Sequence, residues 1–225
     1  MFEAIILAGG FGQRLKEISG DVPKPMIQVG SEPFLYRLMR ALESNGCSRI
    51  ILSLHFKSDF IIDKIQSDRP VGCQIDYVVD DNPLGTGGAI KNASESISGS
   101  KFISINGDTY TDIDYLTMFE GAEEGKVTIS AIMVEDASRY GSLDVDIHGN
   151  LINFREKKSA GRGLINTGTY VIPTKLIRNF ELDEFSIESD FFPRFSDSIK
   201  VFKTQGLFID IGVPKDYWKA CEILA

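Results

Sequence analysis

The chain has 225 residues, of which 43% are hydrophobic and 25% are charged, values close to those of an average soluble globular protein. Its 24 basic and 32 acidic side chains give a formal net charge of -8, which argues against a broad basic surface for nucleic acid. The sequence contains no apolar stretch long enough to span a membrane, and its first residues lack the pattern of a signal peptide. We therefore expect a cytoplasmic protein that binds neither nucleic acid nor membrane.

Strand and helix patterns alternate in the first half of the chain. Short apolar runs that are typical of buried parallel strands lie at residues 4–8, 50–54, 75–79 and 102–105. Apolar residues at helical spacing predict helices between Ser31 and Gly46, around residues 60–65 and over about residues 88–97. This alternation favours right-handed βαβ units, with ligands bound at the carboxyl ends of the strands.

The second half is richer in strands. Residues 143–147 and 151–154 flank a turn at 148–150 and predict a hairpin. The fold class we predict is α/β, with a mixed, mainly parallel central sheet, helices on both of its faces and a β-rich second part. The absence of a linker or a low-complexity tract favours a single domain over residues 1–225.

Cys47, Cys73 and Cys221 are scattered, without a CxxC pair or a histidine beside them. Neither a disulfide framework nor a zinc site is expected from this spacing.

A glycine-rich segment follows the first predicted strand in the order Gly-Gly-x-Gly-x-Arg, from Gly9 to Arg14. Glycine lets backbone N–H groups approach phosphate oxygens closely, and a helix beginning after the loop adds a favourable dipole. Arg14 offers a bidentate cation, and Lys24 lies between two prolines that fix its loop. The segment therefore predicts a triphosphate-binding loop.

These residues resemble the sugar-1-phosphate nucleotidylyltransferases, whose signature Leu-Ala-Gly-Gly-x-Gly-x-Arg-Leu is followed by Pro-Lys-Pro. Residues 7–15 and 23–25 match both parts. The resemblance implies a Rossmann-like, GT-A-like fold and an enzyme that joins a nucleoside triphosphate to a sugar 1-phosphate and releases pyrophosphate. It also implies that residues 1–112 form a nucleotide-binding half and residues 113–225 a sugar-phosphate-binding half.

Two aspartates lie at the ends of predicted strands, Asp108 after residues 102–105 and Asp210 in the segment 208–212. Magnesium takes few carboxylates and leaves coordination positions for phosphate and water. A lone aspartate after a strand is more often a turn or a helix cap. The resemblance implies instead that Asp108 and Asp210 together bind Mg²⁺.

The loop at residues 84–89 opens a predicted helix, and its glycines would allow the chain to lie flat against a planar ligand. The resemblance implies that this loop contacts the nucleobase, through Gly85 and Thr86. Asp80 and Asp81 could accept a hydrogen bond from a base, although loop carboxylates are usually solvated. The predicted nucleotide-binding residues are Leu7, Ala8, Gly9, Gly10, Gly12, Arg14, Gly85, Thr86 and Asp108.

The positions that match the sugar 1-phosphate pocket of the family lie around and after the predicted hairpin. Glu156 and Asn166 offer acceptors and donors for sugar hydroxyls, and Lys157 offers a cation for the attacking phosphate. The family often has a β-branched residue after Tyr-Gly, whereas Ser142 stands there in this chain. The predicted sugar-phosphate-binding residues are Gly141, Glu156, Lys157, Asn166 and Thr167.

For the reaction we expect Arg14, Lys24 and Lys157 to be the catalytic residues, acting by positioning and charge neutralisation. A phosphate dianion is already a competent nucleophile, so neither His55 nor His148 is expected to act as a general base.

Among members of the family, the chain is most similar to the D-glycero-D-manno-heptose 1-phosphate guanylyltransferases, through its length and its segments 84–89, 163–168 and 208–214. This similarity implies GTP as the nucleotide and a role in making capsule or lipopolysaccharide precursors. Glucose, mannose or N-acetylmuramate 1-phosphate with another nucleotide fits the same motifs, as does cytidylyl transfer to a surface precursor. A molybdopterin nucleotidyltransferase and an inactive nucleotide-binding regulatory subunit are the alternatives from other classes. The apolar C-terminal segment packs on the core or forms a contact in a homo-oligomer.

Overall fold

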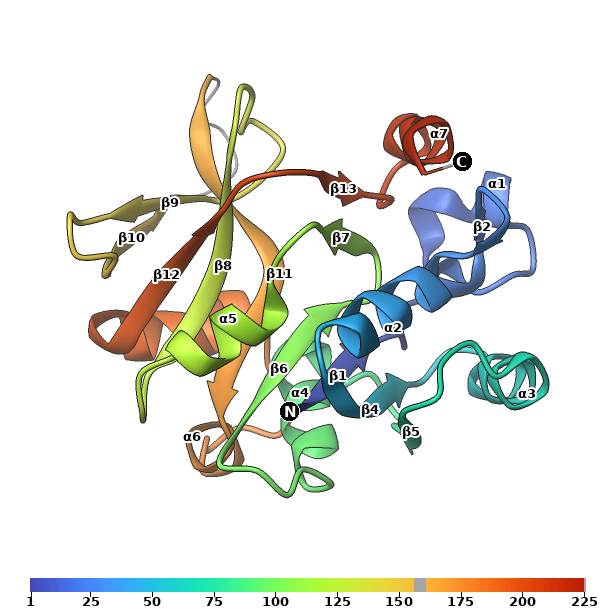
Figure 1. The fold of residues 1–225 in the computed structure, drawn as a ribbon, viewed down its shortest axis with the longest axis horizontal. Helices are drawn as coiled ribbons and strands as arrows, with labels where there is room; N and C mark the ends of the chain where they lie inside the picture. Colours follow the sequence, from blue (N-terminus) through green and yellow to red (C-terminus); the bar gives the residue numbers. More distant parts are fainter. Residues whose placement is uncertain (156–160, 225) are drawn as a thin grey trace.

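A computed structural model describes residues 1–155 and 161–224 of the chain (Figure 1). Its central sheet has nine strands, seven of them in the order β10-β9-β11-β6-β1-β4-β5, while β8 pairs with β11 and with β12. The strands are β1 (Phe2–Leu7), β2 (Gln28–Val29), β3 (Glu32–Pro33), β4 (Cys47–Leu54), β5 (Gln74–Val79), β6 (Lys101–Asn106), β7 (Thr109–Thr111), β8 (Val127–Val134), β9 (Ser142–Val145), β10 (Leu151–Arg155), β11 (Gly163–Pro173), β12 (Ile199–Thr204) and β13 (Phe208–Asp210).

Helices and short helical turns connect these strands. The helices are α1 (Lys16–Ser19), α2 (Phe34–Ser44), α3 (Ser58–Asp68), α4 (Gly85–Ser94), α5 (Tyr115–Gly121), α6 (Thr174–Arg178) and α7 (Pro214–Ile223). The turns are η1 (Gln13–Leu15), η2 (Lys24–Met26), η3 (Ile187–Phe191) and η4 (Phe192–Ser198).

The first half builds the parallel part of the sheet. β1 pairs in parallel with both β4 and β6, and β4 pairs in parallel with β5. Successive side chains of β1 point to opposite faces, and both Ile5 and Ile6 are fully buried. This burial explains the continuous apolar run in the sequence, because helices cover both faces of the strand.

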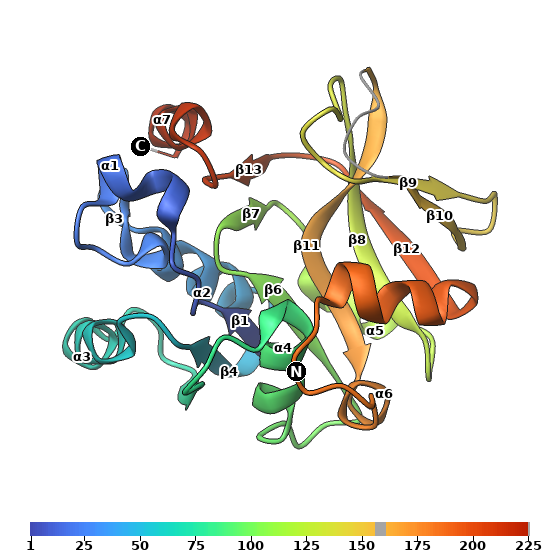
Figure 2. The same cartoon turned by 180° about the vertical axis from the view of Figure 1, so that it is seen from behind.

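Two hydrophobic cores lie on opposite faces of the sheet. One core contains Ala4 and Ile6 of β1 together with residues of α2, α3, α5 and α7. The other contains Ile5 and residues of α4, α6 and the turns η3 and η4. Figure 2 shows α4 and α6 on the face opposite to the one that α2 covers in Figure 1. The predicted mixed sheet with helices on both faces is therefore confirmed.

The second half joins the same sheet through β11, which is antiparallel to β6 and to β8. β9 and β10 form the predicted antiparallel hairpin, with its turn at residues 146–150. The nine-stranded sheet thus continues from the first half into the second. The division into two functional halves of one domain stays a prediction.

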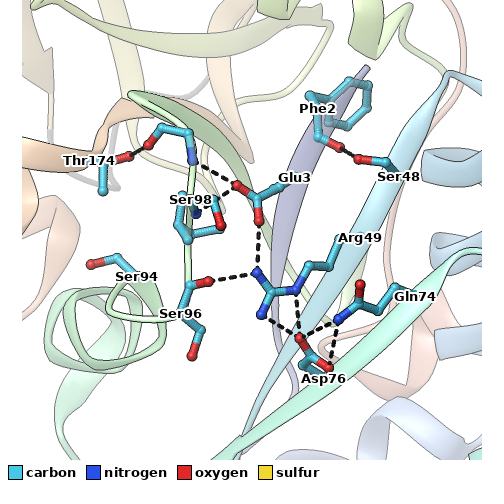
Figure 3. A network of polar contacts seen from close by, with 12 residues as sticks. Phe2, Glu3, Ser48, Arg49, Gln74, Asp76, Ser94, Ser96, Ser98 and Thr174 are labelled. Atoms are coloured by element: carbon cyan, nitrogen blue, oxygen red, sulfur yellow. Dashed lines mark hydrogen bonds and ion pairs between the residues drawn. The ribbon is translucent and has the colours of Figure 1, made fainter.

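A polar network ties strands together at the end of the sheet where β1, β4 and β5 begin (Figure 3). Arg49 of β4 donates to Glu3 of β1 at 2.9 Å and to Asp76 of β5 at 2.5 Å. It also donates to the carbonyl oxygen of Ser96 at 2.7 Å, and Glu3 accepts the backbone N–H of Ser98 at 2.8 Å. The loops that contain the predicted site residues follow the opposite, carboxyl ends of these strands.

The C-terminal helix α7 packs only partly on the core. Tyr217 and Ala220 are buried, and the Tyr217 hydroxyl donates to the carbonyl oxygen of Gln28 at 2.9 Å. Trp218 and Ile223 are exposed. In the described ranges no helix combines the length and the apolar character that crossing a bilayer requires.

Candidate active site

The glycine-rich loop after β1 is held between the end of β4 and the turn η2. A Cβ atom on Gly9 would stand 2.8 Å from the backbone nitrogen of His55. Gly12 has a φ of +62°, and a Cβ atom there would stand 2.8 Å from Cβ of Lys24. Glycine is required at both positions, because a side chain would push the loop away from its neighbours.

The helix expected after this loop is short and does not begin directly behind it. The turn η1 comes first, and α1 then spans only four residues, Lys16–Ser19. A helix this short has a small dipole, so the positive field for phosphates must come from side chains. Arg14 in η1 and Lys24 in η2 are in place to supply it.

A cavity of about 360 Å³ opens at the carboxyl ends of β1, β4, β5 and β6. This volume lies within the range of small-molecule pockets. The lining residues are Leu7, Gly9, Gly10, Phe11, Lys24, Pro25, Ser53, His55, Asp80, Pro83, Leu84, Gly85, Thr86, Ala89, Asn106, Gly107 and Asp108. The cavity therefore joins the glycine loop to the loop at residues 84–89, as the sequence predicts for a nucleotide site.

Asp80 contributes a buried carboxylate to the wall of this cavity. Only 6% of Asp80 is exposed, and its Oδ1 atom accepts a hydrogen bond from the Asn92 amide at 2.6 Å. Its carbonyl oxygen lies 2.7 Å from Nδ1 of His55. Burial raises the pKa of Asp80, while the Asn92 hydrogen bond lowers it. Asp81, the other carboxylate considered from the sequence, is exposed.

The glycines that follow pack against the protein's own chain. Helix α4 begins at Gly85, three residues earlier than the sequence predicts. A Cβ atom on Gly85 would stand 2.5 Å from the carbonyl oxygen of Phe185, which accepts the N–H groups of Gly87 and Gly88. The Thr86 hydroxyl accepts the backbone N–H of Ile187 at 3.0 Å. These glycines serve to dock the segment at residues 183–187, a reason different from the flat ligand surface that we expected.

The two predicted metal carboxylates are brought together. Asp210, the last residue of β13, is paired with Thr109 of β7. The N–H of Ile211 donates to the carbonyl oxygen of Asp108 at 3.0 Å. Burial raises the pKa of Asp210, and the negative charge of Asp108 raises it further. A neighbouring carboxylate raises the pKa in this way because two negative charges close together repel each other.

Lys24 neutralises part of this charge. Its Nζ atom lies 2.5 Å from Oδ2 of Asp108, and only 11% of the lysine side chain is exposed. A second cavity, of about 320 Å³, is lined by Gly10, Gly12, Arg14, Lys24, Asp108 and Gly212. Both predicted cations, Arg14 and Lys24, therefore line the same cavity as Asp108 and two glycines of the loop.

The donor set fits a hard divalent cation. No group of three or more histidine, cysteine, aspartate or glutamate side chains gathers as a metal site in the part of the chain that the structure describes. Asp108 and Asp210 are instead a pair of hard oxygen donors that interact electrostatically, and Asp108 lines the second cavity. Such a pair leaves coordination positions for phosphate oxygens and water.

On the other side of β6, strand β11 carries the predicted residues Asn166 and Thr167. Gly168 has a φ of +78°, and a Cβ atom there would stand 2.5 Å from the amide nitrogen of Asn106. The pairing of β11 with β8 shifts in register between Asn166 and Tyr170, so the strand bulges at this point. The bulge brings Gly168, two residues after Asn166, against Asn106 at the end of the strand that leads into Asp108.

Asn166 and Thr167 face different surroundings. The amide of Asn166 donates to the Tyr170 hydroxyl at 2.9 Å and to Oε1 of Glu188 at 3.1 Å. The Thr167 side chain is buried, and its hydroxyl donates to the carbonyl oxygen of Ser130 at 3.3 Å. Glu188 was missed because its neighbourhood in the sequence carries no motif, and its partner Asn166 is 22 residues away.

Gly141 lies between Tyr140 and strand β9, and Tyr140 is close enough to Asp210, one of the two predicted metal carboxylates, to be affected by its charge. Burial and then the charge of Asp210 raise the pKa of Tyr140 to about 12. Arg139 is paired with Asp216 and was not among the predicted residues. The predicted residues Glu156 and Lys157 lie outside the described residues.

Comparison with known proteins agrees with this geometry. Residues 3–225 match the family model described as nucleotidyl transferase. The D-glycero-alpha-D-manno-heptose 1-phosphate guanylyltransferase of Campylobacter jejuni is 36% identical over 222 residues, which cover 96% of this chain and 97% of the relative. The enzyme of the same description from Aneurinibacillus thermoaerophilus is 35% identical, covering 97% and 96% of the two chains.

The fold also matches a crystal structure of HddC from Yersinia pseudotuberculosis. The two chains are 50% identical, and each is covered over 100% of its length with a TM-score of 0.93. HddC has also been crystallised in complex with GMP-PN, and that structure matches with a TM-score of 0.92. The resemblance found in the sequence motifs is confirmed, and the chain belongs to the nucleotidyl transferase family.

Proposed function

We propose that this protein transfers the guanylyl group of GTP to D-glycero-α-D-manno-heptose 1-phosphate, which gives GDP-heptose and pyrophosphate. The cavity at the carboxyl ends of β1, β4, β5 and β6 is the base cavity of our proposal. The observation that carries the proposal is that this cavity reaches Lys24 and Asp108, and that Asp108 interacts with both Lys24 and Asp210. The two guanylyltransferases and HddC, which match over nearly their whole lengths, support the choice of nucleotide and sugar. The GDP-sugar product suits the synthesis of a surface polysaccharide. We propose that the protein makes this precursor in the cytoplasm.

The buried carboxylate of Asp80 supports guanine as the base. Guanine presents two adjacent donors, its ring N1–H and its exocyclic amino group, and an ionised carboxylate is an acceptor only. Uracil and thymine place a single N–H between two carbonyl oxygens, which a carboxylate repels. Asn92 donates to Oδ1 of Asp80, which lines the cavity, and so holds the carboxylate in place. We propose that Oδ2 of Asp80 accepts a hydrogen bond from guanine.

The reaction follows from the order of the groups along the site. An oxygen of the sugar phosphate attacks the α-phosphorus of GTP, a new P–O bond forms, and the bond to the pyrophosphate oxygen breaks. Asp108 and Asp210 would hold Mg²⁺, which would supply charge stabilisation at the phosphates. Arg14 and Lys24 neutralise the triphosphate and the leaving pyrophosphate.

No general base is required, because the attacking phosphate is already anionic. His55 is engaged with the carbonyl oxygen of Asp80, and His148 lies in the turn of the β9–β10 hairpin. Lys157 is our proposed cation for the attacking phosphate. Gly141, Glu156 and Asn166 are our proposed contacts to the sugar phosphate.

The direct test is pyrophosphate release in Mg²⁺, measured over a matrix of GTP, ATP, CTP, UTP and dTTP with the 1-phosphates of manno-heptose, mannose, glucose and N-acetylmuramate. We expect turnover with GTP and the heptose phosphate, and its loss in Asp108→Asn. Asp112→Asn, an exposed carboxylate four residues further on, is the matched control and should keep activity.

Turnover confined to a different pair would overturn the assignment of substrates and keep the reaction. GTP binding without turnover of any pair would overturn the enzyme in favour of a nucleotide-binding regulatory subunit.

A further inference from the structure

Beyond the two predicted metal carboxylates, Asn166 forms a polar cluster with Tyr170 and Glu188, two residues that the proposed reaction does not use. The Asn166 amide donates to the Tyr170 hydroxyl at 2.9 Å and to Oε1 of Glu188 at 3.1 Å. The Tyr170 hydroxyl donates to the same Oε1 atom at 3.4 Å. The two bonds to Glu188 both end on Oε1, and neither uses Oε2.

The cluster rests on a rigid support. Tyr170 has no exposed surface, and its ring packs edge-on against Phe192 with centroids 5.1 Å apart. Burial and then the charge of Glu188 hold the pKa of Tyr170 well above its ordinary value, so the phenol keeps its proton. Glu188 itself is exposed. A buried phenol and an amide therefore orient a carboxylate that solvent reaches.

Two contacts of residues beside this cluster place it next to the base cavity. Ile187, the neighbour of Glu188, donates to the Thr86 hydroxyl, and Thr86 lines the cavity. Gly168, two residues from Asn166, packs against the amide of Asn106, which lines the same cavity.

The sheet order gives the cluster its position relative to the substrate. Asp80 follows β5, Asp108 follows β6, and Asn166 lies on β11, on the other side of β6 from β5. A base at Asp80 and an α-phosphate at Asp108 leave the β11 side for the acceptor sugar. The cluster thus lies where the sugar of the second substrate must extend.

We propose that Glu188 binds hydroxyl groups of the acceptor sugar, with Tyr170 and Asn166 as the residues that orient it; this inference rests on the proposed function. A carboxylate accepts from sugar hydroxyls, and the bonds from Asn166 and Tyr170 both end on Oε1 of Glu188, so Oε2 is the atom we expect to face the sugar. The negative charge of Glu188 favours neutral, hydroxyl-rich sugars and disfavours an acidic sugar such as N-acetylmuramate. Glu188 is therefore a specificity-determining residue for the sugar.

The test is the substitution Glu188→Gln, which keeps the shape and removes the charge. We expect the KM for the sugar 1-phosphate to rise roughly tenfold, the effect of losing one hydrogen bond to a charged group. The KM for GTP should change by less than about twofold, since the base and triphosphate lie elsewhere. Glu184→Gln, an exposed carboxylate on the same segment, is the matched control and should change neither constant.

Tyr170→Phe separates binding from packing, because it keeps the ring against Phe192 and removes the hydroxyl. We expect it to raise the KM for the sugar alone. Combined with Glu188→Gln, it should add less than its own single effect, because Tyr170 acts through Glu188.

An active wild-type enzyme whose KM for the sugar is unchanged in Glu188→Gln would overturn this inference alone. Equal increases in both KM values would also overturn it, since they indicate a structural role. A wild-type protein that turns over no substrate pair would overturn the proposed function and this inference with it.

Discussion

Asp80 shows how a single residue acquires a role from its surroundings. In the sequence it is one of two adjacent carboxylates in a loop, and most such carboxylates are solvated. In the structure it is buried against Asn92 on the wall of the base cavity, while Asp81 is exposed. The sequence could suggest the pair but could not select between its members, because burial depends on how α4 packs.

The substitution Asp80→Asn should lower kcat/KM for GTP by roughly tenfold or more, because the amide replaces one acceptor with a donor that faces the donors of guanine. The kcat/KM for the sugar 1-phosphate at saturating GTP should change little. Steady-state kinetics with GTP and ATP measures this preference, and Asp81→Asn is the control. An unchanged ratio of GTP to ATP turnover in Asp80→Asn would rule out Asp80 as the guanine contact.

The affinity for GTP should also depend on pH through Asp80. Burial raises its pKa and Asp81 adds to the rise, whereas Asn92 and His55 lower it. Because the pKa is raised, Asp80 gains its proton at a higher pH than an ordinary aspartate, and GTP affinity should weaken as pH falls through that range. Calorimetric titration of GTP into wild type and Asp80→Asn isolates the effect, since the nucleotide's own titration is common to both. Parallel pH profiles for the two proteins would contradict the prediction.

Several site residues were predictable because their signal is local. The glycine loop, Lys24 and the strand that ends before Asp108 are contiguous motifs, and the structure gathers all three around the second cavity. Glu188 left no such signal, because it reaches Asn166 across 22 residues from a different element.

At the level of elements, the start of α4 is a docking surface for residues 183–187. The sequence places glycines there but could not reveal their purpose, since the contact between Thr86 and Ile187 spans 101 residues. The same long separation hid the true first residue of the helix, Gly85. Packing of a distant segment, and not local propensity, sets this boundary.

The substitution Gly88→Ala should disrupt that docking, because the new Cβ would stand 2.2 Å from the carbonyl oxygen of Asp183. We expect a loss of unfolding free energy of about 1–3 kcal/mol, the usual cost of overpacking, and a higher KM for both substrates. Chemical denaturation and steady-state kinetics measure the two effects. Gly121→Ala, where a Cβ would meet no atom within 4 Å, is the matched control and should be tolerated. A Gly88→Ala protein as stable as this control would show that the segment at residues 183–187 adjusts freely.

At the scale of the whole molecule, the two ends of the parallel strands do different work. The carboxyl ends carry the cavity, while Arg49, Glu3 and Asp76 tie the amino ends of three strands (Figure 3). The alternation of strands and helices predicted the parallel half, because each buried strand is a short apolar run. The paths of β8, β11 and β12 could not be predicted in the same way, since their pairing depends on contacts far apart in sequence.

This separation predicts that Arg49→Ala loses stability and keeps its catalytic constants. Removing the guanidinium breaks hydrogen bonds to two carboxylates and to Ser96, and we expect a loss of about 2 kcal/mol. Thermal unfolding should show a lower Tm, whereas the KM values measured well below that temperature should match wild type. A changed KM with an unchanged Tm would contradict the structural role of the network.

The most direct test of the proposed guanylyl transfer is the fate of isotope-labelled sugar phosphate. Heptose 1-phosphate that carries ¹⁸O in its phosphate group is incubated with GTP, Mg²⁺ and the protein, and both products are analysed by mass spectrometry. We expect GDP-heptose that retains all of the ¹⁸O, together with an equal amount of unlabelled pyrophosphate, because the sugar phosphate oxygen attacks the α-phosphorus. GTP that remains intact, or that is converted to GDP and inorganic phosphate without a GDP-sugar, would contradict the proposed transfer.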